Sequence, residues 1–310
     1  MPAFHVQRSR RIQAPVEKIK QALIDFRQWS AWSPWLITEP EASLTYSPTQ
    51  GEVGSKYSWE GNLVGVGDML LSVIKDDQLD MQLQFIKPFK STARIVFNLV
   101  PQGDATEITW NMHGKLPFFM FFMVEKMKSW IGMDYERGLT MLKDYIEKGS
   151  VPSKLSIDGE AQLEGQRYIG IEHDCAIKDL GTVMKDDYTK LYGLLEEKNL
   201  PMDVIPFSIT NSFDIVKSRA NIISAVPVKE SLELVPPFFL GEMPASRVLK
   251  VTHTGSYDHI GNGWAAAISY SRYKKIKCQK KPVGIERYLN DPAVTPTEEL
   301  VTEILLPLKA

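Results

Sequence analysis

The stretch 283–308, VGIERYLNDPAVTPTEELVTEILLPL, holds two short runs with the residue pattern of strands, 283–289 and 301–308. The segment between them is rich in Pro, Asn, Asp and Thr, which predicts a turn or loop. One acid, Glu286, stands in the first run between apolar and aromatic residues. If inward and outward residues simply alternate along the strand, the Glu286 carboxylate faces solvent. Otherwise it must pair with another group of the protein or meet a cation. The run by itself leaves these alternatives open.

A similar plan occurs earlier in the chain, which suggests an internal duplication. The elements predicted in the two copies are, in order, strand 166–173, helix 180–198 and a strand end at 225–228, then strand 247–253, helix 258–276 and a strand end at 305–308. Each copy closes on a proline between apolar residues. Because proline has no amide hydrogen for a strand ladder, we expect it at a strand end or sheet edge.

The second copy turns from strand to helix at 252–260, THTGSYDHI. Gly255 supplies a permissive backbone, and Ser256 or Asp258 can cap the helix. Gly261 and Gly263 weaken the first turns relative to alanine. Close approach of a neighbour or ligand would explain these two glycines, and so would a loosely formed helix start.

The first half of the chain has a different organisation. A strand at 4–13 precedes a helix that opens at Pro15, and a helical stripe of apolar residues spans 116–147. Between them, turn signals separate the short strand-like runs of an antiparallel meander, which lie at 56–59, 69–74, 81–85, 93–100 and 107–113. Gly65-Val66-Gly67 lacks the third glycine and the following helix of a dinucleotide loop, so it predicts a hairpin.

Two aromatic segments in this half have open interpretations. The stretch 29–35, WSAWSPW, places three tryptophans around a proline, which favours a plug at the end of a core over a ligand platform. The stretch 117–123, PFFMFFM, is apolar on every side. It is either deeply buried or part of the mouth of an apolar cavity.

The stretch 148–154, KGSVPSK, breaks the long helix with Gly and Pro, so it predicts a domain boundary. With 310 residues and 44% hydrophobic residues, the chain is long enough for two domains. We expect an α+β protein with domains at 1–148 and 158–310 and a linker at 149–157.

The net charge and composition of the chain also exclude some classes of partner. A formal net charge of -2 gives no global field for nucleic acid or an anionic membrane. The basic run 274–281 lies at a helix C-terminus, where cations complement the helix dipole, so nucleic-acid binding is not predicted. No segment has the pattern of a signal peptide or a membrane-spanning helix, so membrane insertion is not predicted either. The two cysteines, Cys175 and Cys278, fit a reducing cytoplasm and predict a cytoplasmic protein.

The sequence has no spacing typical of a zinc site, no phosphate loop and no Gly-x-Ser-x-Gly elbow. No metal, cofactor or catalytic set is therefore predicted.

The first half resembles the START-like SRPBCC family, which includes polyketide cyclase-like proteins. The resemblance covers 1–148 and rests on the order of elements and on the motifs RIQAP at 11–15, WSPW at 32–35, KPF at 87–89 and TW at 109–110. It implies a helix-grip fold in which the sheet wraps the long helix around a hydrophobic cavity. Members bind lipids, polyketides and other apolar molecules, and only some are enzymes.

The second half resembles the GyrI-like small-molecule-binding domain, also known as the bacterial transcription activator effector-binding domain. The motifs are HTGSY at 253–257 with Trp264, IERYLNDP at 285–292 and TEILLPL at 302–308, and the resemblance covers 155–310. It implies a duplicated strand-helix-strand plan with an antiparallel sheet and an aromatic pocket that holds one acid. The residues that match pocket positions are Glu286, Tyr288, Trp264, Tyr257 and, least directly, Phe207.

These resemblances predict a protein that binds or sequesters a hydrophobic small molecule, cationic or neutral, because a carboxylate among aromatic rings attracts organic cations. The first alternative is a hydrolase or other modifying enzyme with Glu286 as acid or base, since burial raises a carboxyl pKa and some GyrI-like proteins hydrolyse electrophilic compounds. The second is a ligand-responsive regulatory protein without its own DNA-binding domain, whose protein partner the sequence does not identify.

Overall fold

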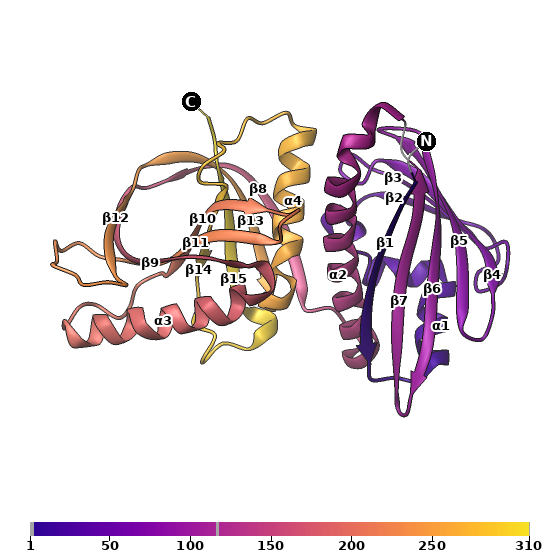
Figure 1. Ribbon diagram of the computed structural model, residues 1–310, viewed down its shortest axis with the longest axis horizontal. Coiled ribbons are helices and arrows are strands. Elements are labelled where there is room, and N and C mark those ends of the chain that lie inside the picture. Colours follow the sequence, from indigo (N-terminus) through magenta and orange to yellow (C-terminus); the bar gives the residue numbers. More distant parts are fainter. Residues whose placement is uncertain (1–2, 116–117, 310) are drawn as a thin grey trace. The chain divides into compact units, whose positions relative to one another are not determined.

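In the computed structural model, which describes residues 3–115 and 118–309, the chain divides into two units, residues 1–152 and 153–310 (Figure 1). Gly149, with a φ of +83°, ends the last helix of the first unit. Of the residues expected to form a linker, 149–157, those from Ser153 onward belong to strand β8 (Ser153–Leu163). They join the second unit because β8 pairs along its length with another strand of that unit.

The first unit is built on a seven-stranded antiparallel sheet in the order β1-β7-β6-β5-β4-β3-β2. The strands are β1 (Ala3–Ile12), β2 (Ser43–Tyr46), β3 (Lys56–Glu60), β4 (Val66–Ile74), β5 (Gln78–Lys87), β6 (Ser91–Gln102) and β7 (Ala105–Lys115). Between β1 and β2 lie α1 (Val16–Ile24) and the short 3₁₀ segments η1 (Phe26–Ala31) and η2 (Leu36–Thr38). The predicted meander is confirmed, and Gly65, with a φ of +72°, stands in the β3–β4 hairpin.

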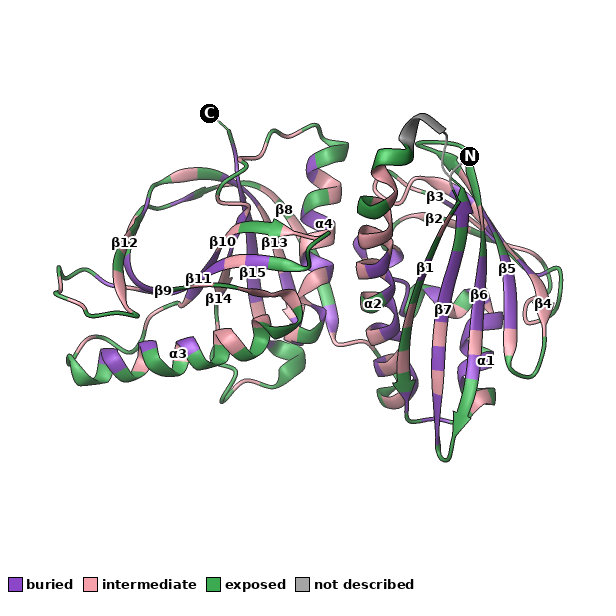
Figure 2. Ribbon diagram, viewed as in Figure 1, coloured by how far each residue is buried: buried purple, intermediate pink, exposed green. Residues whose placement is uncertain are grey.

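The long helix of this unit, α2 (Val124–Lys148), packs along β1 and begins later than the sequence predicted. A 3₁₀ segment, η3 (Phe118–Met123), precedes it, and residues 116 and 117 lie outside the described residues. The apolar stripe is buried from Tyr135 to Ile146 but only partly buried nearer the start of α2 (Figure 2). Phe121 and Phe122 are 62% and 71% exposed, so deep burial of that aromatic segment is wrong for these two side chains.

The core of the first unit is an aromatic cluster under the second half of α2. Trp29, Trp32, Trp110 and Tyr135 are all essentially inaccessible to solvent. The Trp110 and Tyr135 rings stack with their centroids 4.1 Å apart. A Cβ on Gly138 of α2 would lie only 2.8 Å from Trp110 Cζ3, so glycine lets the helix approach this ring. The core-plug interpretation is confirmed for Trp29 and Trp32.

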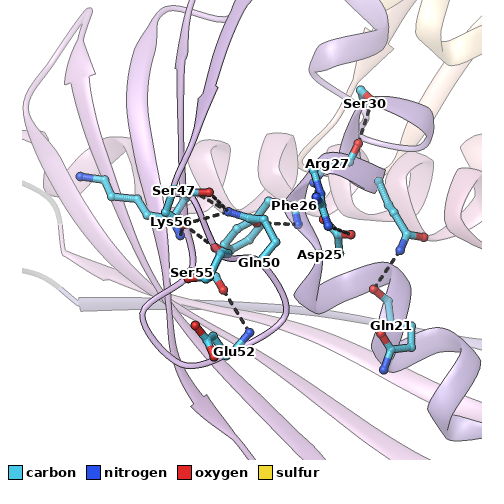
Figure 3. A network of polar contacts seen from close by, with 12 residues as sticks. Gln21, Asp25, Phe26, Arg27, Ser30, Ser47, Gln50, Glu52, Ser55 and Lys56 are labelled. Carbon is cyan, nitrogen blue, oxygen red and sulfur yellow. Dashed lines mark hydrogen bonds and ion pairs between the residues drawn. The ribbon is translucent and has the colours of Figure 1, made fainter.

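A polar network ties η1 to the loop between β2 and β3 (Figure 3). Gln50 Oε1 accepts from the Phe26 N–H at 3.2 Å, and Gln50 Nε2 donates to the Lys56 carbonyl at 3.1 Å. The same Nε2 donates to Ser47 Oγ at 2.9 Å. The first of these bonds satisfies the Phe26 amide at the start of η1, and together the bonds fix the segment that carries Trp29 into the core.

The second unit has an eight-stranded antiparallel sheet in the order β12-β9-β11-β10-β14-β15-β13-β8. The strands after β8 are β9 (Gln166–Ala176), β10 (Phe207–Asp214), β11 (Arg219–Pro227), β12 (Phe239–Met243), β13 (Ser246–Gly255), β14 (Gly284–Tyr288) and β15 (Val301–Pro307). The helices are α3 (Leu180–Glu197) and α4 (Ile260–Tyr273), with 3₁₀ segments η4 (Ile177–Asp179), η5 (Tyr257–His259) and η6 (Thr297–Glu299).

The strand order of this sheet has twofold symmetry. If each strand is replaced by its counterpart in the other half of the unit, the same order is obtained from the opposite edge of the sheet. β8, β9, β10 and β11 of the first half then correspond to β12, β13, β14 and β15 of the second. Corresponding elements begin 80 residues apart, at Gln166 and Ser246 for β9 and β13 and at Leu180 and Ile260 for α3 and α4. The predicted duplication is confirmed, and its pseudo-twofold axis passes between the central strands β10 and β14.

Candidate functional site

The two helices of the second unit cover different strands of its sheet. α3 packs on β9 and β11, whereas α4 packs on β13, β15 and β8, so the central strands β10 and β14 lie between them (Figure 1). Ser224, Ser208, Glu286 and Ile304 are cross-strand neighbours in one row on β11, β10, β14 and β15, and therefore share one face. Ser224 donates a hydrogen bond to α3, and Ile304 packs with α4. Both helices therefore flank the face that carries Glu286.

Glu286 stands in the middle of β14, opposite Ser208. Both carboxylate oxygens accept hydrogen bonds, Oε1 from Trp264 Nε1 at 2.5 Å and Oε2 from the Tyr288 hydroxyl at 2.6 Å. Dense surroundings raise the pKa of Glu286 above its usual value, and the two hydrogen bonds offset part of this rise. The residue is not sealed off, because it keeps partial solvent exposure.

Three tyrosines converge beside this carboxylate. The Tyr288 ring meets Tyr257 edge-on with centroids 5.7 Å apart, and meets Tyr188 of α3 in the same way at 5.9 Å. Burial and then the negative charge of Glu286 raise the pKa of Tyr257 to about 12 and those of Tyr188 and Tyr288 well above the usual value. All three phenols therefore stay protonated at neutral pH and can donate hydrogen bonds.

Two glycines make room for this arrangement. A Cβ on Gly284, two residues before Glu286, would overlap the Trp264 ring, so glycine lets the indole lie flat enough on β14 to reach the carboxylate. A Cβ on Gly263 of α4 would lie 2.6 Å from Ile304 Cδ1. Close approach of a neighbour, one of the two explanations considered for the glycines at this helix start, therefore accounts for Gly263.

We refer to Glu286, Ser208, Tyr188, Tyr257, Trp264 and Tyr288 together as the interhelical site. Residues 161–309 match the family model of the GyrI-like small molecule binding domain, and residues 3–147 match that of polyketide cyclase / dehydrase and lipid transport. The chain is a polyketide cyclase-like domain followed by a GyrI-like domain. Both family assignments expected from the sequence are confirmed, and with them an α+β fold and small-molecule binding as the general role.

Comparison with other proteins adds only distant likenesses. No curated protein matches the chain. Among solved structures, the cryo-EM EcmrR-DNA complex in EcmrR-RPo has 13% identity and a TM-score of 0.43 over 61% of this chain and 69% of that chain. The EcmrR C-terminal domain has 14% identity and a TM-score of 0.40 over 51% and 98%. Protein MLL2253 from Mesorhizobium loti has 16% identity and a TM-score of 0.38 over 48% and 100%.

Of the five residues expected in the pocket of the GyrI-like domain, the structure brings together Glu286, Tyr288, Tyr257 and Trp264 and places Phe207 elsewhere. Phe207 is the neighbour of Ser208 on β10, so its ring points to the opposite face of the sheet. It is fully buried in an apolar cluster and packs edge-on against Tyr168 with centroids 5.5 Å apart. This corrects the expectation for Phe207, because a shift of one residue along a strand reverses the face of a side chain.

Two members of the interhelical site were not anticipated. Tyr188 reaches the site from α3, and its hydroxyl donates to the Phe207 carbonyl at 2.7 Å. Ser208 lies opposite Glu286 and hydrogen bonds to the Tyr288 hydroxyl at 3.1 Å. The only sequence signal for Ser208 was its position in the first repeat, near the residue equivalent to Glu286. The register between the strands is needed to tell whether Ser208 or its neighbour Phe207 is that equivalent.

In the polyketide cyclase-like domain, the space beneath the second half of α2 is filled by the protein's own aromatic side chains. Apolar side chains with partial exposure, such as Val124, Met127 and Ile131, lie along the first half of the helix. Across residues 3–115 and 118–309, no three His, Cys, Asp or Glu side chains gather as a metal site. Over the same ranges, no helix has the length and hydropathy needed to cross a bilayer.

Proposed function

We propose that the GyrI-like domain binds a hydrophobic small molecule with one positive charge at the interhelical site, and that Glu286 is the counter-ion. The observation that carries this proposal is a carboxylate held by Trp264 and Tyr288 in surroundings dense enough to raise its pKa. Within the described part of the chain, Glu286 has no cationic side chain as a partner. A ligand cation would supply the missing charge.

The physical chemistry of the site favours an organic cation over a hydrated metal ion. At about 4 Å, two opposite charges attract by roughly 4 kcal/mol with an effective dielectric constant of about 20. Aromatic faces such as those of Trp264 and Tyr257 add about 0.5–2 kcal/mol each to the binding of a desolvated cation. Both oxygens of the Glu286 carboxylate already accept hydrogen bonds, so its negative charge is delocalised over its donors. A delocalised charge suits a bulky cation.

The pseudo-twofold axis indicates how such a ligand is oriented. Glu286 faces Ser208 across the axis, so the first repeat places a neutral residue where the second repeat places the acid. Counting back 80 residues from Trp264 and Tyr257 gives Met184 and Ile177, which are both partly buried. We infer that the charged end of the ligand lies against the second repeat, and that its apolar end lies against aliphatic side chains of the first.

One observation favours a second function for the same residues. A carboxyl in dense surroundings with a raised pKa, hydrogen bonded to a neutral phenol, is also suited to general acid or base catalysis. Glu286 would then take a proton from an attacking water molecule, and Tyr288 would donate to the oxygen on which charge develops. In this alternative the GyrI-like domain is a hydrolase of apolar substrates.

Calorimetric titration of the full chain with tetraphenylphosphonium, and with neutral triphenylphosphine oxide as a matched control, tests the binding function. We expect Glu286→Gln to weaken binding of the cation about 10- to 100-fold, since solvation of the cation offsets about half of the Coulomb attraction. Binding of the neutral compound should change less than about threefold, which is under 1 kcal/mol. Equal affinity of both proteins for the cation would refute Glu286 as the counter-ion.

The hydrolase alternative has its own readout. Electrophilic esters and strained-ring compounds with apolar bodies are incubated with the full chain and with Glu286→Gln, and products are measured by mass spectrometry. Turnover by the wild type that is lost in Glu286→Gln would establish catalysis at this site. Binding without turnover would leave the GyrI-like domain as a binding module.

A further inference from the structure

A polar row crosses the helix-facing side of the second sheet and ends at the interhelical site. Ser224 of β11 is the cross-strand partner of Ser208 of β10, and Ser208 is the partner of Glu286 of β14. Directly opposed residues on antiparallel strands have their Cβ atoms about 4.5–5.5 Å apart and share a face. The two serines therefore lie side by side on the face that carries Glu286.

The far end of the row is a buried aspartate that orients a histidine. Ser224 Oγ donates to Asp187 Oδ2 at 2.9 Å, and the other oxygen, Oδ1, lies 2.9 Å from His173 Nε2. Asp187 and Ser224 are 1% and 0% exposed, whereas the His173 side chain is 38% exposed. The imidazole therefore connects a buried carboxylate to solvent. It belongs to β9, which lies three strand spacings, about 14 Å, from the strand β14 that carries Glu286.

The near end of the row has a defined direction of hydrogen bonding. Tyr288 donates its only hydroxyl proton to Glu286 Oε2 at 2.6 Å. The contact of 3.1 Å between Ser208 Oγ and the Tyr288 hydroxyl must then have Ser208 as its donor. The order of donation is from Ser208 to Tyr288 to Glu286. Each bond in such a chain polarises and strengthens the next.

Other groups that face Glu286 do not compete with this chain. The remaining titratable neighbours are Tyr188 from α3 and Tyr257 from η5, and the pKa of each is raised, so both stay neutral. Arg287 follows Glu286 on β14 but points to the opposite face, where it pairs with Glu303 at 2.9 Å. The charge nearest in the row on its own face is the Asp187–His173 pair.

We propose that Ser208 is a positioning residue, which aims the Tyr288 hydroxyl at Glu286 and joins the interhelical site to the Asp187–His173 pair. With Glu286 ionised, Ser208 and Ser224 donate in opposite directions, toward Tyr288 and toward Asp187. When Glu286 carries a proton, it donates to Tyr288, which frees the phenol proton for Ser208 and the Ser208 proton for Ser224, while Ser224 keeps donating to Asp187. The proton on Glu286 thus reverses the hydrogen bonds donated by Tyr288 and Ser208 and leaves that of Ser224 unchanged. The only proton gained is the one that Glu286 binds.

The effect of Ser208 on ligand binding rests on the proposed function of Glu286 as the ligand's counter-ion. A carboxylate that must ionise to bind a cation needs donors that stabilise its charge, and Ser208 strengthens one of the two donors. The row also carries the partly exposed His173 at its far end, where the imidazole hydrogen bonds to Asp187.

The test is a direct titration of the Glu286 carboxyl in the full chain, without ligand. Infrared difference spectra between the wild type and Glu286→Gln isolate the carboxyl band, which disappears as Glu286 ionises. We expect Ser208→Ala to move the midpoint of this titration up by about half a pH unit, because the loss of one supporting hydrogen bond weakens the stabilisation of the anion. Ser208→Thr keeps a hydroxyl and should restore the wild-type midpoint.

Two comparisons separate positioning from a general loss of structure. Ser271→Ala removes another buried serine hydroxyl, whose partner is the Ile268 carbonyl in α4, and should not move the midpoint. If Ser208→Ala does not fold, Ser208→Cys replaces the hydroxyl with a weak donor and should shift the midpoint in the same direction. An unchanged midpoint in Ser208→Ala or in Ser208→Cys would overturn the positioning role.

The link to the far end is tested by a double-mutant cycle of Ser208→Ala and His173→Gln on the same titration. Residues this far apart with no shared partners act additively, so a non-additive shift of the midpoint supports the row, and additive shifts overturn the link. The proposed function can fail independently. If tetraphenylphosphonium binds Glu286→Gln as tightly as the wild type while Ser208→Ala still shifts the midpoint, the counter-ion role is wrong and the positioning role stands.

Discussion

Gly284→Ala is the substitution for which the geometry of the interhelical site makes the sharpest prediction. The added Cβ would overlap the six-membered ring of Trp264 and lie 3.1 Å from the Leu305 carbonyl oxygen. Neither neighbour can yield without cost, since the carbonyl belongs to the adjacent strand β15 and the indole hydrogen bonds to Glu286 at 2.5 Å. We therefore expect the ring to be displaced and the hydrogen bond to break.

The magnitude follows from two opposing effects. Overpacking of a filled interior costs about 1–3 kcal/mol. Replacing glycine within a strand by alanine recovers about 0.5–1 kcal/mol, because the unfolded chain has less freedom to lose. The expected net loss of stability is about 1–2 kcal/mol. Loss of the Trp264 ring face should also weaken binding of a hydrophobic cation by about 2- to 30-fold.

Urea denaturation of the full chain measures the first effect, and calorimetric titration with tetraphenylphosphonium measures the second. Gly193→Ala is the matched control, because a Cβ at that position in α3 has no heavy atom within 4 Å. It should leave binding unchanged and raise stability by up to about 1 kcal/mol, the helix preference for alanine. If Gly284→Ala is as stable as the wild type and binds the cation equally well, the added Cβ does not displace Trp264.

Two further outcomes are expected. Burial raises the pKa of Glu286, so the folded chain holds this proton more tightly than the unfolded chain does, and ionisation costs stability as the pH rises from the usual value of 4.5 through the raised one. Glu286→Gln should therefore be more stable than the wild type at about pH 8, with the difference lost at about pH 4, in thermal denaturation at both pH values; a constant difference would contradict this. Trp110→Ala, which empties the centre of the first unit's core, should lower the stability of that unit by about 3–5 kcal/mol in urea denaturation, and a loss under 1 kcal/mol would show that the core collapses around the gap.

The two units of the chain belong to families that bind small molecules, and their aromatic side chains differ in solvent exposure. In the first, Trp110 and Tyr135 stack with centroids 4.1 Å apart and are inaccessible to solvent. In the second, Glu286 and Trp264 keep partial exposure although they are hydrogen bonded to each other. The second unit therefore offers the better-defined starting point for a search for the ligand.

Local sequence patterns predicted much of the fold. Local strand patterns located most strands of both sheets but not β2, β8 and β12. The recurring proline at Pro227 and Pro307 marked the ends of equivalent strands. The start of α2 was misjudged, because an apolar stripe shows which residues can form one helix face but not where the helix begins. Phe121 and Phe122 continue the apolar pattern before α2 and are nevertheless exposed.

The sequence motifs and the resemblances they carry predicted two domains, a duplication in the second, and a position for Glu286 near Tyr257, Trp264 and Tyr288. Each motif is a short run of residues, and the resemblance to the GyrI-like domain is what groups the separate motifs in one pocket. Only the tertiary structure decided that Ser208 and Tyr188 complete the site and that Phe207 faces away from it. The reason is the register between β10 and β14, since a shift of one residue exchanges the two faces of a strand, and contacts between distant residues set that register.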